Sequence, residues 1–261
     1  MPLLTIATTA SGNPMGAQRY EQEVVAGARS VLPGWQVRHQ VARSLRSDLP
    51  GTMRLPMGRL QQASVTERAT LGRLAFGRRA GVLHRMDLVL PPGPGPNVVT
   101  IHDTVAWRFP DESAPIAAAA EEARRADTVI CVSAFTANEV QRFLGVRDPV
   151  VVHNGVDQKF FEAVALTAEQ RVGLGLSGPY VLHAGGASER KNLAALAEAW
   201  PVIHRDHPEL TLALAGPAHP RRTALFSALP GVQLLGRVPD DLVPGLVAGA
   251  SVVVVPSTYE G

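Results

Sequence analysis

The residues best suited to chemistry follow short apolar runs, and the clearest group lies in AGGASERKN, residues 184–192. Gly185 and Gly186 allow a ligand to approach the main chain, and Arg190 and Lys191 place two cations directly before a helical stretch. A helix N-terminus favours an anion, and neighbouring cations strengthen that preference. Lys191 is also one of only two lysines among 25 basic residues. The pattern predicts a phosphate or diphosphate site, and a solvated basic turn is the alternative.

Three further positions carry weaker signals. His102, followed by Asp103, ends an apolar run and could donate a hydrogen bond or a proton; the alternative is a pair that orders its own loop. A small-residue loop reaches Gly16 before a helix, which fits either an anion contact or a plain turn. Glu260 follows the last apolar run, where a carboxylate beside a diphosphate suits sugar hydroxyls.

Metal ligation is not expected, although four histidines lie near the ends of apolar runs. These histidines have no H-x-x-x-H or H-x-H spacing, which metal sites commonly use. They are His84, His102, His153 and His183. We therefore predict no bound metal and no other cofactor.

The elements that position these residues alternate between strands and helices, which is typical of parallel α/β sheets. The predicted strands are 3–9, 35–42, 83–90, 97–102, 128–133 and 150–153, and then 180–184, 210–215, 232–235 and 251–255. The predicted helices are 18–31, 116–126, 193–204, 221–229 and 241–250. Runs such as SVVVVP, residues 251–256, predict strands that are buried on both faces.

Two doubly wound domains are expected. A Gly-rich stretch with no strand divides the two series of elements, so we assign residues 1–157 to a first domain, 158–178 to a linker and 179–261 to a second domain. The second has only four predicted strands, whereas domains of ~100–150 residues are usual. We therefore expect the second domain to be incomplete.

Composition narrows the possible classes of protein. The chain has 261 residues, 46% of them hydrophobic and 18% charged, with one Cys and a net charge of +2. These values exclude a disordered chain, an internal disulfide and a strongly basic nucleic-acid binder. No apolar run reaches the ~18 residues of a membrane span, and the N-terminus lacks a cationic leader. We expect a cytoplasmic protein.

One basic region is nevertheless present in the first half of the chain. Residues 35–86 contain ten arginines but only two acids, Asp48 and Glu67, and residues 60–79 have apolar residues at helical spacing. A basic amphipathic helix can lie on an anionic membrane surface. The alternatives are a solvated basic face or a site for an anionic acceptor.

Taken in order, these segments resemble the retaining glycosyltransferases of family 4, whose GT-B fold has two Rossmann-like domains facing across a cleft. The matching segments are MGAQRY, VVTIHD, VICVSAFTANEV, VVHNGVD, YVLHAGGASERKN, LTLALAGP and VQLLGRVPDDLVPGLVAGASVVVVPSTYEG. The resemblance implies metal-independent transfer of a sugar from a nucleotide-diphosphate-sugar to an acceptor hydroxyl, with retention at the anomeric carbon. A mannosyltransferase-like activity in glycolipid or polysaccharide synthesis is the best match.

The resemblance also assigns roles to individual residues. Arg190 and Lys191 would hold the donor diphosphate, which Gly185 lets approach. Glu260 matches the first glutamate of the family's pair and would bind hydroxyls of the donor sugar, while His102 would contact that sugar near the reacting centre. The remaining assignments place Gly16 by the phosphates or the acceptor, and Arg237 and Val238 near the base. The family's second glutamate would follow Gly261, so we expect residues 1–261 alone to be inactive.

Two alternatives of other classes stay open. The first is a nucleotide-sugar epimerase or hydrolase on the same fold. The second is a non-catalytic module that binds nucleotide sugars or anionic membranes.

Overall fold

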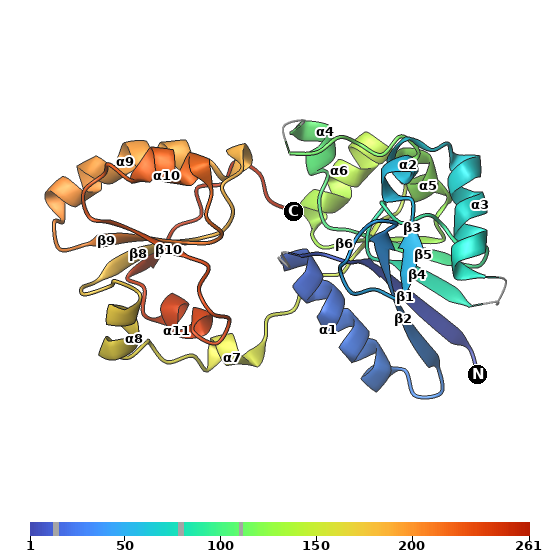
Figure 1. The fold of residues 1–261 in the computed structure, drawn as a ribbon, viewed down its shortest axis with the longest axis horizontal. Coiled ribbons are helices and arrows are strands. Elements are labelled where there is room, and N and C mark those ends of the chain that lie inside the picture. Colours follow the sequence, from blue (N-terminus) through green and yellow to red (C-terminus); the bar gives the residue numbers. More distant parts are fainter. Residues whose placement is uncertain (13–15, 78–80, 110–111) are drawn as a thin grey trace. The chain divides into compact units, whose positions relative to one another are not determined.

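The computed structural model describes residues 1–12, 16–77, 81–109 and 112–261. By their internal contacts these residues form two compact units, Met1–Asn154 and Gly155–Glu260 (Figure 1). Both units are parallel β-sheets flanked by helices, so the prediction of a Rossmann-like α/β fold is confirmed. The stretch expected as a linker, 158–178, carries the short helices α7 (Gln158–Phe161) and α8 (Ala168–Gly173) and falls within the second unit.

The first unit is built on a seven-stranded sheet with the order β3-β2-β1-β4-β5-β6-β7, in which all pairings are parallel. Its strands are β1 (Leu3–Thr9), β2 (Gln36–Ser44), β3 (Met53–Leu55), β4 (Val82–Arg85), β5 (Asn97–Ile101), β6 (Thr128–Cys131) and β7 (Val150–Val151). Its helices are α1 (Gly16–Val31), α2 (Met57–Gln62), α3 (Val65–Phe76), α4 (Val105–Arg108), α5 (Ala119–Arg125) and α6 (Ala134–Leu144).

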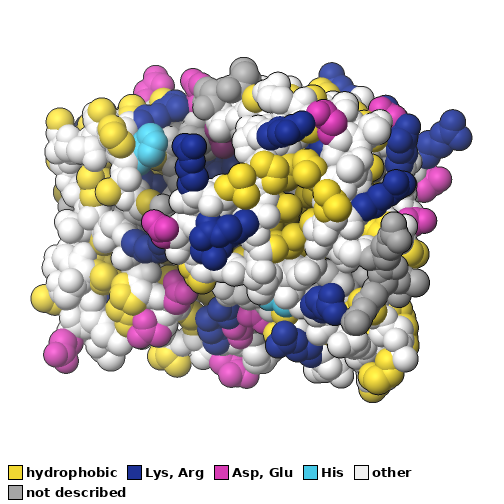
Figure 2. Space-filling model, turned by 45° about the vertical axis from the view of Figure 1, so that its right-hand side comes forward, with side chains coloured by type: hydrophobic (Ala, Val, Ile, Leu, Met, Phe, Trp, Pro, Cys, Tyr) yellow, Lys and Arg dark blue, Asp and Glu magenta, His cyan; other side chains and the backbone are white. Residues whose placement is uncertain are grey.

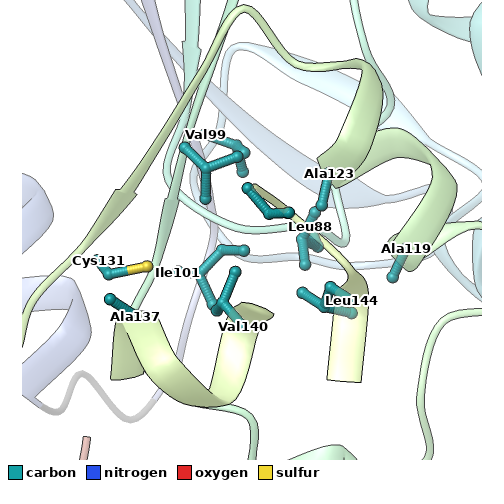
Figure 3. Packing of buried hydrophobic residues seen from close by; sticks show 11 residues of the cluster. Leu88, Val99, Ile101, Ala119, Ala123, Cys131, Ala137, Val140 and Leu144 are labelled. Carbon is teal, nitrogen blue, oxygen red and sulfur yellow. The ribbon is translucent and has the colours of Figure 1, made fainter. Parts of the chain in front are cut away.

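Helices cover both faces of this sheet. On one face α1 packs through Val25 against Ile6 of β1. On the other, α5 and α6 pack against β5 and β6, and Figure 3 shows their side chains meeting Val99 and Ile101 in one cluster. Because the strands are parallel, this packing brings the loops after β1, β4 and β5 to the same edge of the sheet.

The basic region of the first unit differs from the expected amphipathic helix. The stretch 60–79 forms parts of two helices, because Ser64 caps α3 in a capping box with Glu67; residues 78–80 lie outside the described residues. Arg68 and Arg85 are fully buried and both pair with Glu122 of α5, at 2.6 Å and 3.2 Å. Two of the ten arginines are therefore internal and are not available to a surface partner.

Other arginines of this region are also engaged. Arg43 donates to the carbonyl of Leu49 at 2.8 Å, Arg54 donates to the carbonyl of Leu45, and Arg59 pairs with Glu67 at 3.2 Å. On the face drawn in Figure 2, basic side chains are scattered beside acidic and apolar ones and do not form a continuous basic patch. Five of the ten arginines of residues 35–86 are thus engaged in contacts within the first unit.

The second unit has a four-stranded parallel sheet with the order β10-β9-β8-β11. The strands are β8 (Tyr180–Ala184), β9 (Thr211–Ala215), β10 (Val232–Gly236) and β11 (Val252–Val253). The helices α9 (Leu193–Asp206) and α10 (Pro220–Phe226) pack on one face, and α11 (Val243–Ala248) packs on the other with α8 (Figure 1). A one-turn 3₁₀ helix, η1 (Glu189–Lys191), lies between β8 and α9.

The prediction that the run SVVVVP is buried on both faces is wrong. Val252 and Val253 are 55% and 46% exposed. These side chains are exposed because β11 pairs only with β8 in the described sheet and forms its edge. An apolar run shows that a strand forms, but it does not show whether a neighbour covers it.

Several elements escaped sequence analysis, namely β3 and the helices α2, α4, α6, α7 and α8. Among the described residues, every helix is too short or too polar to cross a membrane.

Candidate functional site

The Gly-Gly loop of the second unit connects β8 to α9. After β8 the chain passes Gly185 and Gly186 and forms η1, which ends at Lys191. Asn192 then adopts a left-handed conformation, with φ of 51°, before α9 begins at Leu193. Lys191 therefore ends a separate turn and does not itself open α9, because the left-handed residue interrupts the helix. Both cations still lie within three residues of the α9 N-terminus, as an anion site requires.

The segment after β11 is attached to this turn. The Asn192 side chain donates to the carbonyl of Pro256 at 3.2 Å, and the main-chain N–H of Thr258 donates to the carbonyl of Arg190 at 2.9 Å. The Arg190 guanidinium donates to the carbonyl of Tyr259 at 3.2 Å. These bonds form because β8 and β11 are parallel neighbours, so their loops leave the same edge of the sheet.

Glu260 is brought directly onto the two predicted cations. Its carboxylate oxygens lie 2.6 Å and 2.7 Å from Lys191 Nζ, and one lies 3.2 Å from Arg190 Nη1. The side chains of Arg190 and Lys191 are only 16% and 17% exposed, whereas that of Glu260 is 46% exposed. Burial alone would raise the pKa of Glu260, but the hydrogen bonds and charge of Lys191 lower it overall. The structure thus unites three of the predicted site residues in one cluster.

Two residues that sequence analysis missed fix the shape of the loop. The buried Arg222 of α10 donates to the carbonyl of Gly185, and to that of Pro217 at 2.9 Å. Gly216 has φ of 141°, and a side chain there would overlap the carbonyl oxygen of Gly185. A Cβ added at Gly185 would lie 3.5 Å from the His183 ring, which is an ordinary van der Waals distance. The close approach of the main chains after β8 and β9 therefore requires a glycine at position 216 and not at position 185.

His183 lies beneath the same loop. It is 2% exposed, and Nδ1 lies 3.1 Å from the carbonyl of Val254, which leaves Nε2 without a hydrogen-bond partner among the described residues. Burial lowers its pKa, and the charges of Arg222 and Lys191 lower it further. The hydrogen bond to Val254 opposes this shift, and Nδ1 is its donor. Sequence analysis noted this histidine only as an unlikely metal ligand, and its position at a strand end was the available signal.

The two residues predicted near the base lie after β10. Arg237 is exposed, while Val238 is 7% exposed and packs in the core with Leu166 and Tyr180. A contact between Val238 and a ligand would therefore have to use its main chain. The roles of both residues stay predictions.

The first unit contains a cavity of about 310 Å³ at the edge where β4 and β5 end. His102 and Asp103 line it from the loop after β5, Asp87 from the loop after β4, and Trp107 from α4. The described lining residues include acids, amides, hydroxyls and apolar groups but neither Lys nor Arg. This lining suits hydroxyl groups and a sugar ring better than it suits a phosphate.

His102 has a defined orientation in this cavity. Its ring packs edge-on against Tyr20 with the centroids 4.8 Å apart, and its buried Nε2 has no hydrogen-bond partner in the described part of the chain. Burial lowers its pKa, and the charges of Asp103 and Asp87 oppose that shift. Asp103 accepts from the Val105 N–H at 3.0 Å, so this carboxylate caps the next turn. His102 thus lines the cavity, and its unsatisfied ring nitrogen is buried.

Two carboxyl groups near this cavity were not predicted as site residues. Burial and the charge of Asp87 raise the pKa of Glu21, in α1, to about 7. Asp87 is exposed, but desolvation by the surrounding protein raises the pKa of its carboxyl group as well. No local pattern revealed these groups, since Glu21 and Asp87 are distant in sequence. Glu21 can therefore change its protonation state near neutral pH.

Gly16 is the first residue of α1 and is exposed, and a side-chain carbon added there would meet no other described atom within 4 Å. The rest of the predicted small-residue loop, 13–15, lies outside the described residues. Nothing in the described packing requires a glycine at this position. Its role stays a prediction, as does the prediction that no metal binds. In the described part of the chain, no three His, Cys, Asp or Glu side chains gather as metal ligands would.

Two parallel α/β units, one with a cation-bearing Gly loop at a helix N-terminus and one with a polar cavity, define a GT-B type of protein. The family model Glycosyltransferase Family 4 matches residues 18–160, and the model Glycosyl transferases group 1 matches residues 178–261. The chain belongs to glycosyltransferase family 4. No curated protein matches its sequence.

Solved structures agree on the fold. Sucrose-phosphate synthase from Thermosynechococcus elongatus is 19% identical with a TM-score of 0.69, over 100% of this chain and 76% of that one. Anabaena HepE in complex with UDP-glucose is 19% identical with a TM-score of 0.66, over 98% and 74%. WaaG, a glycosyltransferase involved in lipopolysaccharide biosynthesis, is 15% identical with a TM-score of 0.63, over 99% and 75%. At these identities the likeness shows the shared GT-B fold.

Proposed function

We propose that this protein transfers a sugar from a nucleotide-diphosphate-sugar to an acceptor hydroxyl, with retention at the anomeric carbon. The observation that carries the proposal is the pair Arg190 and Lys191, both mostly buried, on a Gly-Gly loop beside the α9 N-terminus. Cations held in place before the reaction stabilise the charge that develops on a leaving diphosphate. The UDP-glucose bound to the structural neighbour HepE supports a donor of this class.

The two units have separate tasks in this proposal. The second unit holds the donor, with Arg190 and Lys191 on the diphosphate, Glu260 on hydroxyls of the sugar, and Arg237 and the Val238 main chain near the base. The first unit takes the acceptor in the cavity beside His102, whose free ring nitrogen contacts the reacting sugar. A donor phosphate oxygen accepts the proton of the acceptor hydroxyl, so no protein nucleophile is required, and the family resemblance implies that no metal is needed.

Two finer assignments rest on the family resemblance, namely a mannosyl donor and an acceptor in glycolipid or polysaccharide synthesis. The assignment of a cytoplasmic protein that contacts the inner face of the membrane rests on the composition of the chain and on the basic residues of 35–86. The structural neighbour WaaG acts in lipopolysaccharide synthesis, which supports an acceptor of this kind. For membrane contact the remaining support is the exposed part of α3, with Arg73 and the 78% exposed Leu74.

The test is Lys191→Ala, compared with the matched control Lys159→Ala at the only other lysine, which is exposed on α7. Loss of a charge-assisted hydrogen bond, worth about 1.5–3 kcal/mol, weakens nucleoside diphosphate binding by about 10–150-fold. Titration calorimetry with nucleoside and nucleoside diphosphate measures this loss. Lys191→Ala is expected to leave the affinity for the nucleoside unchanged. Lys159→Ala is expected to leave both affinities unchanged.

Unchanged diphosphate affinity in folded Lys191→Ala protein would remove the diphosphate site from this loop. Product analysis completes the test, because an epimerase or hydrolase acts on the donor alone, and a binding module binds donor without turnover.

A further inference from the structure

The carboxylate of Glu260 occupies the cations that the proposed donor diphosphate needs. Both of its oxygens face Lys191 Nζ, at 2.6 Å and 2.7 Å, and one also contacts Arg190 at 3.2 Å. An ammonium group has three donors, and two of those of Lys191 are directed at this carboxylate. A phosphate oxygen that approaches the same cations therefore competes with Glu260 for their donors.

We propose that this exchange makes Glu260 a specificity-determining residue, which favours the intact nucleotide-sugar over the free nucleoside diphosphate. The inference rests on the proposed function. An intact donor displaces the carboxylate and then offers it sugar hydroxyls, which donate to it. A free nucleoside diphosphate displaces it and offers no donor in return. The product is thus held more weakly than its charge predicts, and its release is favoured.

The surroundings of the cluster fit an exchange of partners. The main chain of the turn that carries the cations is held without the Glu260 side chain, since the Lys191 N–H bonds the carbonyl of Ser188 at 3.1 Å and the Thr258 N–H bonds that of Arg190 at 2.9 Å. Glu260 is the open member of the cluster, 46% exposed against 16% and 17% for the cations. The carboxylate can therefore leave while the turn that carries Arg190 and Lys191 keeps its main-chain bonds.

Charge makes the outcome depend on the ligand. A diphosphate and a carboxylate are both anions, so a displaced Glu260 lies beside the bound diphosphate and is repelled by it at short range. Hydroxyl groups of a sugar relieve this cost because they donate hydrogen bonds to an ionised carboxylate. The lowered pKa of Glu260 keeps the group ionised near neutral pH, so the competition persists under working conditions.

A neighbouring glutamate provides a matched control. Glu189 belongs to the same 3₁₀ turn, but it is 66% exposed and lies 3.8 Å from Arg221, a different arginine. It changes the charge near the loop without contacting either cation of the cluster. Comparing Glu189→Gln with Glu260→Gln separates competition for the cations from a general change in potential.

The experiment measures, by titration calorimetry, the affinities of the unmodified protein, Glu260→Gln and Glu189→Gln for UDP, GDP and their glucose and mannose conjugates. Glu260→Gln is expected to bind the free diphosphate about tenfold more tightly, which corresponds to about 1.4 kcal/mol. Its affinity for the nucleotide-sugar stays the same or falls. The preference for intact donor over diphosphate thus drops at least tenfold, while Glu189→Gln keeps the original preference.

Equal changes for diphosphate and nucleotide-sugar, or no change for either, would overturn the role of Glu260. If those results accompany diphosphate binding that depends on Lys191, the proposed function stands and only this inference fails. If neither the unmodified protein nor Glu260→Gln binds any diphosphate, both fail. Diphosphate binding seen only in Glu260→Gln supports the inference directly. Circular dichroism confirms that each variant is folded, as expected for substitutions at exposed side chains.

Discussion

The two units each place one carboxylate against two cations, and the two clusters serve different purposes. In the first unit Glu122 pairs with Arg68 and Arg85, and the three side chains are at most 1% exposed. In the second, Glu260 pairs with the partly open Arg190 and Lys191. The first cluster is sealed inside the protein, whereas the second can exchange its carboxylate for another anion. Access to solvent, and not the set of charges, distinguishes a structural ion cluster from a candidate binding site.

Besides its ion pairs, the buried cluster contains hydrogen bonds from both arginines to main-chain carbonyls. Arg68 donates to the carbonyls of Leu60 and Leu88, each at 2.6 Å, and Arg85 donates to that of Leu90 at 2.8 Å. Burial lowers the pKa of Arg85, and the charge of Glu122 opposes that shift. The Arg68 bonds connect α3 with α2 and with the loop after β4, and the Arg85 bond connects β4 with the same loop. They also hold the loop that carries Asp87 to the candidate acceptor cavity.

The largest expected effect comes from removing the buried carboxylate. Glu122→Ala leaves two arginines buried without their counter-charge, which costs about 3–5 kcal/mol of stability. Glu121→Ala is the matched control on the same helix, because Glu121 pairs with Arg125 at the surface and an exposed pair contributes about 0–1 kcal/mol. Urea denaturation followed by circular dichroism measures both losses. Nucleoside diphosphate binding by the second unit stays intact while the protein is folded.

Equal losses of stability in Glu122→Ala and Glu121→Ala would contradict the structural role of the buried cluster. A loss of diphosphate affinity in folded Glu122→Ala would show that the two clusters do not have separate tasks.

The contrast between the clusters also shows how much the sequence could predict. Strands such as β1 and β8 were predicted to the residue, because their apolar runs are bounded by polar or small residues. The placement of Arg190 and Lys191 between β8 and α9 was predicted as well, since its signal lies within nine residues, while their role stays a prediction. The burial of Arg68 was not, because its partner Glu122 is 54 positions away and belongs to another helix. For the same reason Arg222 and Gly216 were missed, since their contacts with Gly185 exist only in the folded sheet.

A second effect, of intermediate size, concerns the chemistry assigned to the first unit. His102→Ala removes an unsatisfied ring nitrogen beside the cavity, and loss of one positioned donor at a reacting centre costs about 2–4 kcal/mol, or about 10²–10³ in kcat. Diphosphate affinity stays within a few-fold, because the cations are in the second unit. Initial-rate kinetics and calorimetry measure the two quantities separately.

The control is His153→Ala, which removes an exposed histidine after β7 that bonds the carbonyl of Val132. If kcat of His102→Ala stays within a few-fold of the unmodified protein, His102 only orders its loop. If diphosphate affinity falls as far as kcat, the division of tasks between the units is wrong.

The smallest expected effect concerns the arginines that the buried cluster leaves at the surface. Arg73 is exposed on α3 beside the exposed Leu74, a pair suited to an anionic membrane surface. One arginine near such a surface is worth about 1 kcal/mol, so Arg73→Gln should weaken vesicle binding about fivefold. Arg205→Gln is the control, since Arg205 is equally basic and exposed but lies in the second unit beside Asp206. Sedimentation with anionic and neutral vesicles at rising salt measures binding, which should fall with salt because screening shortens the reach of surface charge. Equal binding to both vesicle types, or equal losses in Arg73→Gln and Arg205→Gln, would mean that the basic composition of residues 35–86 serves the fold alone.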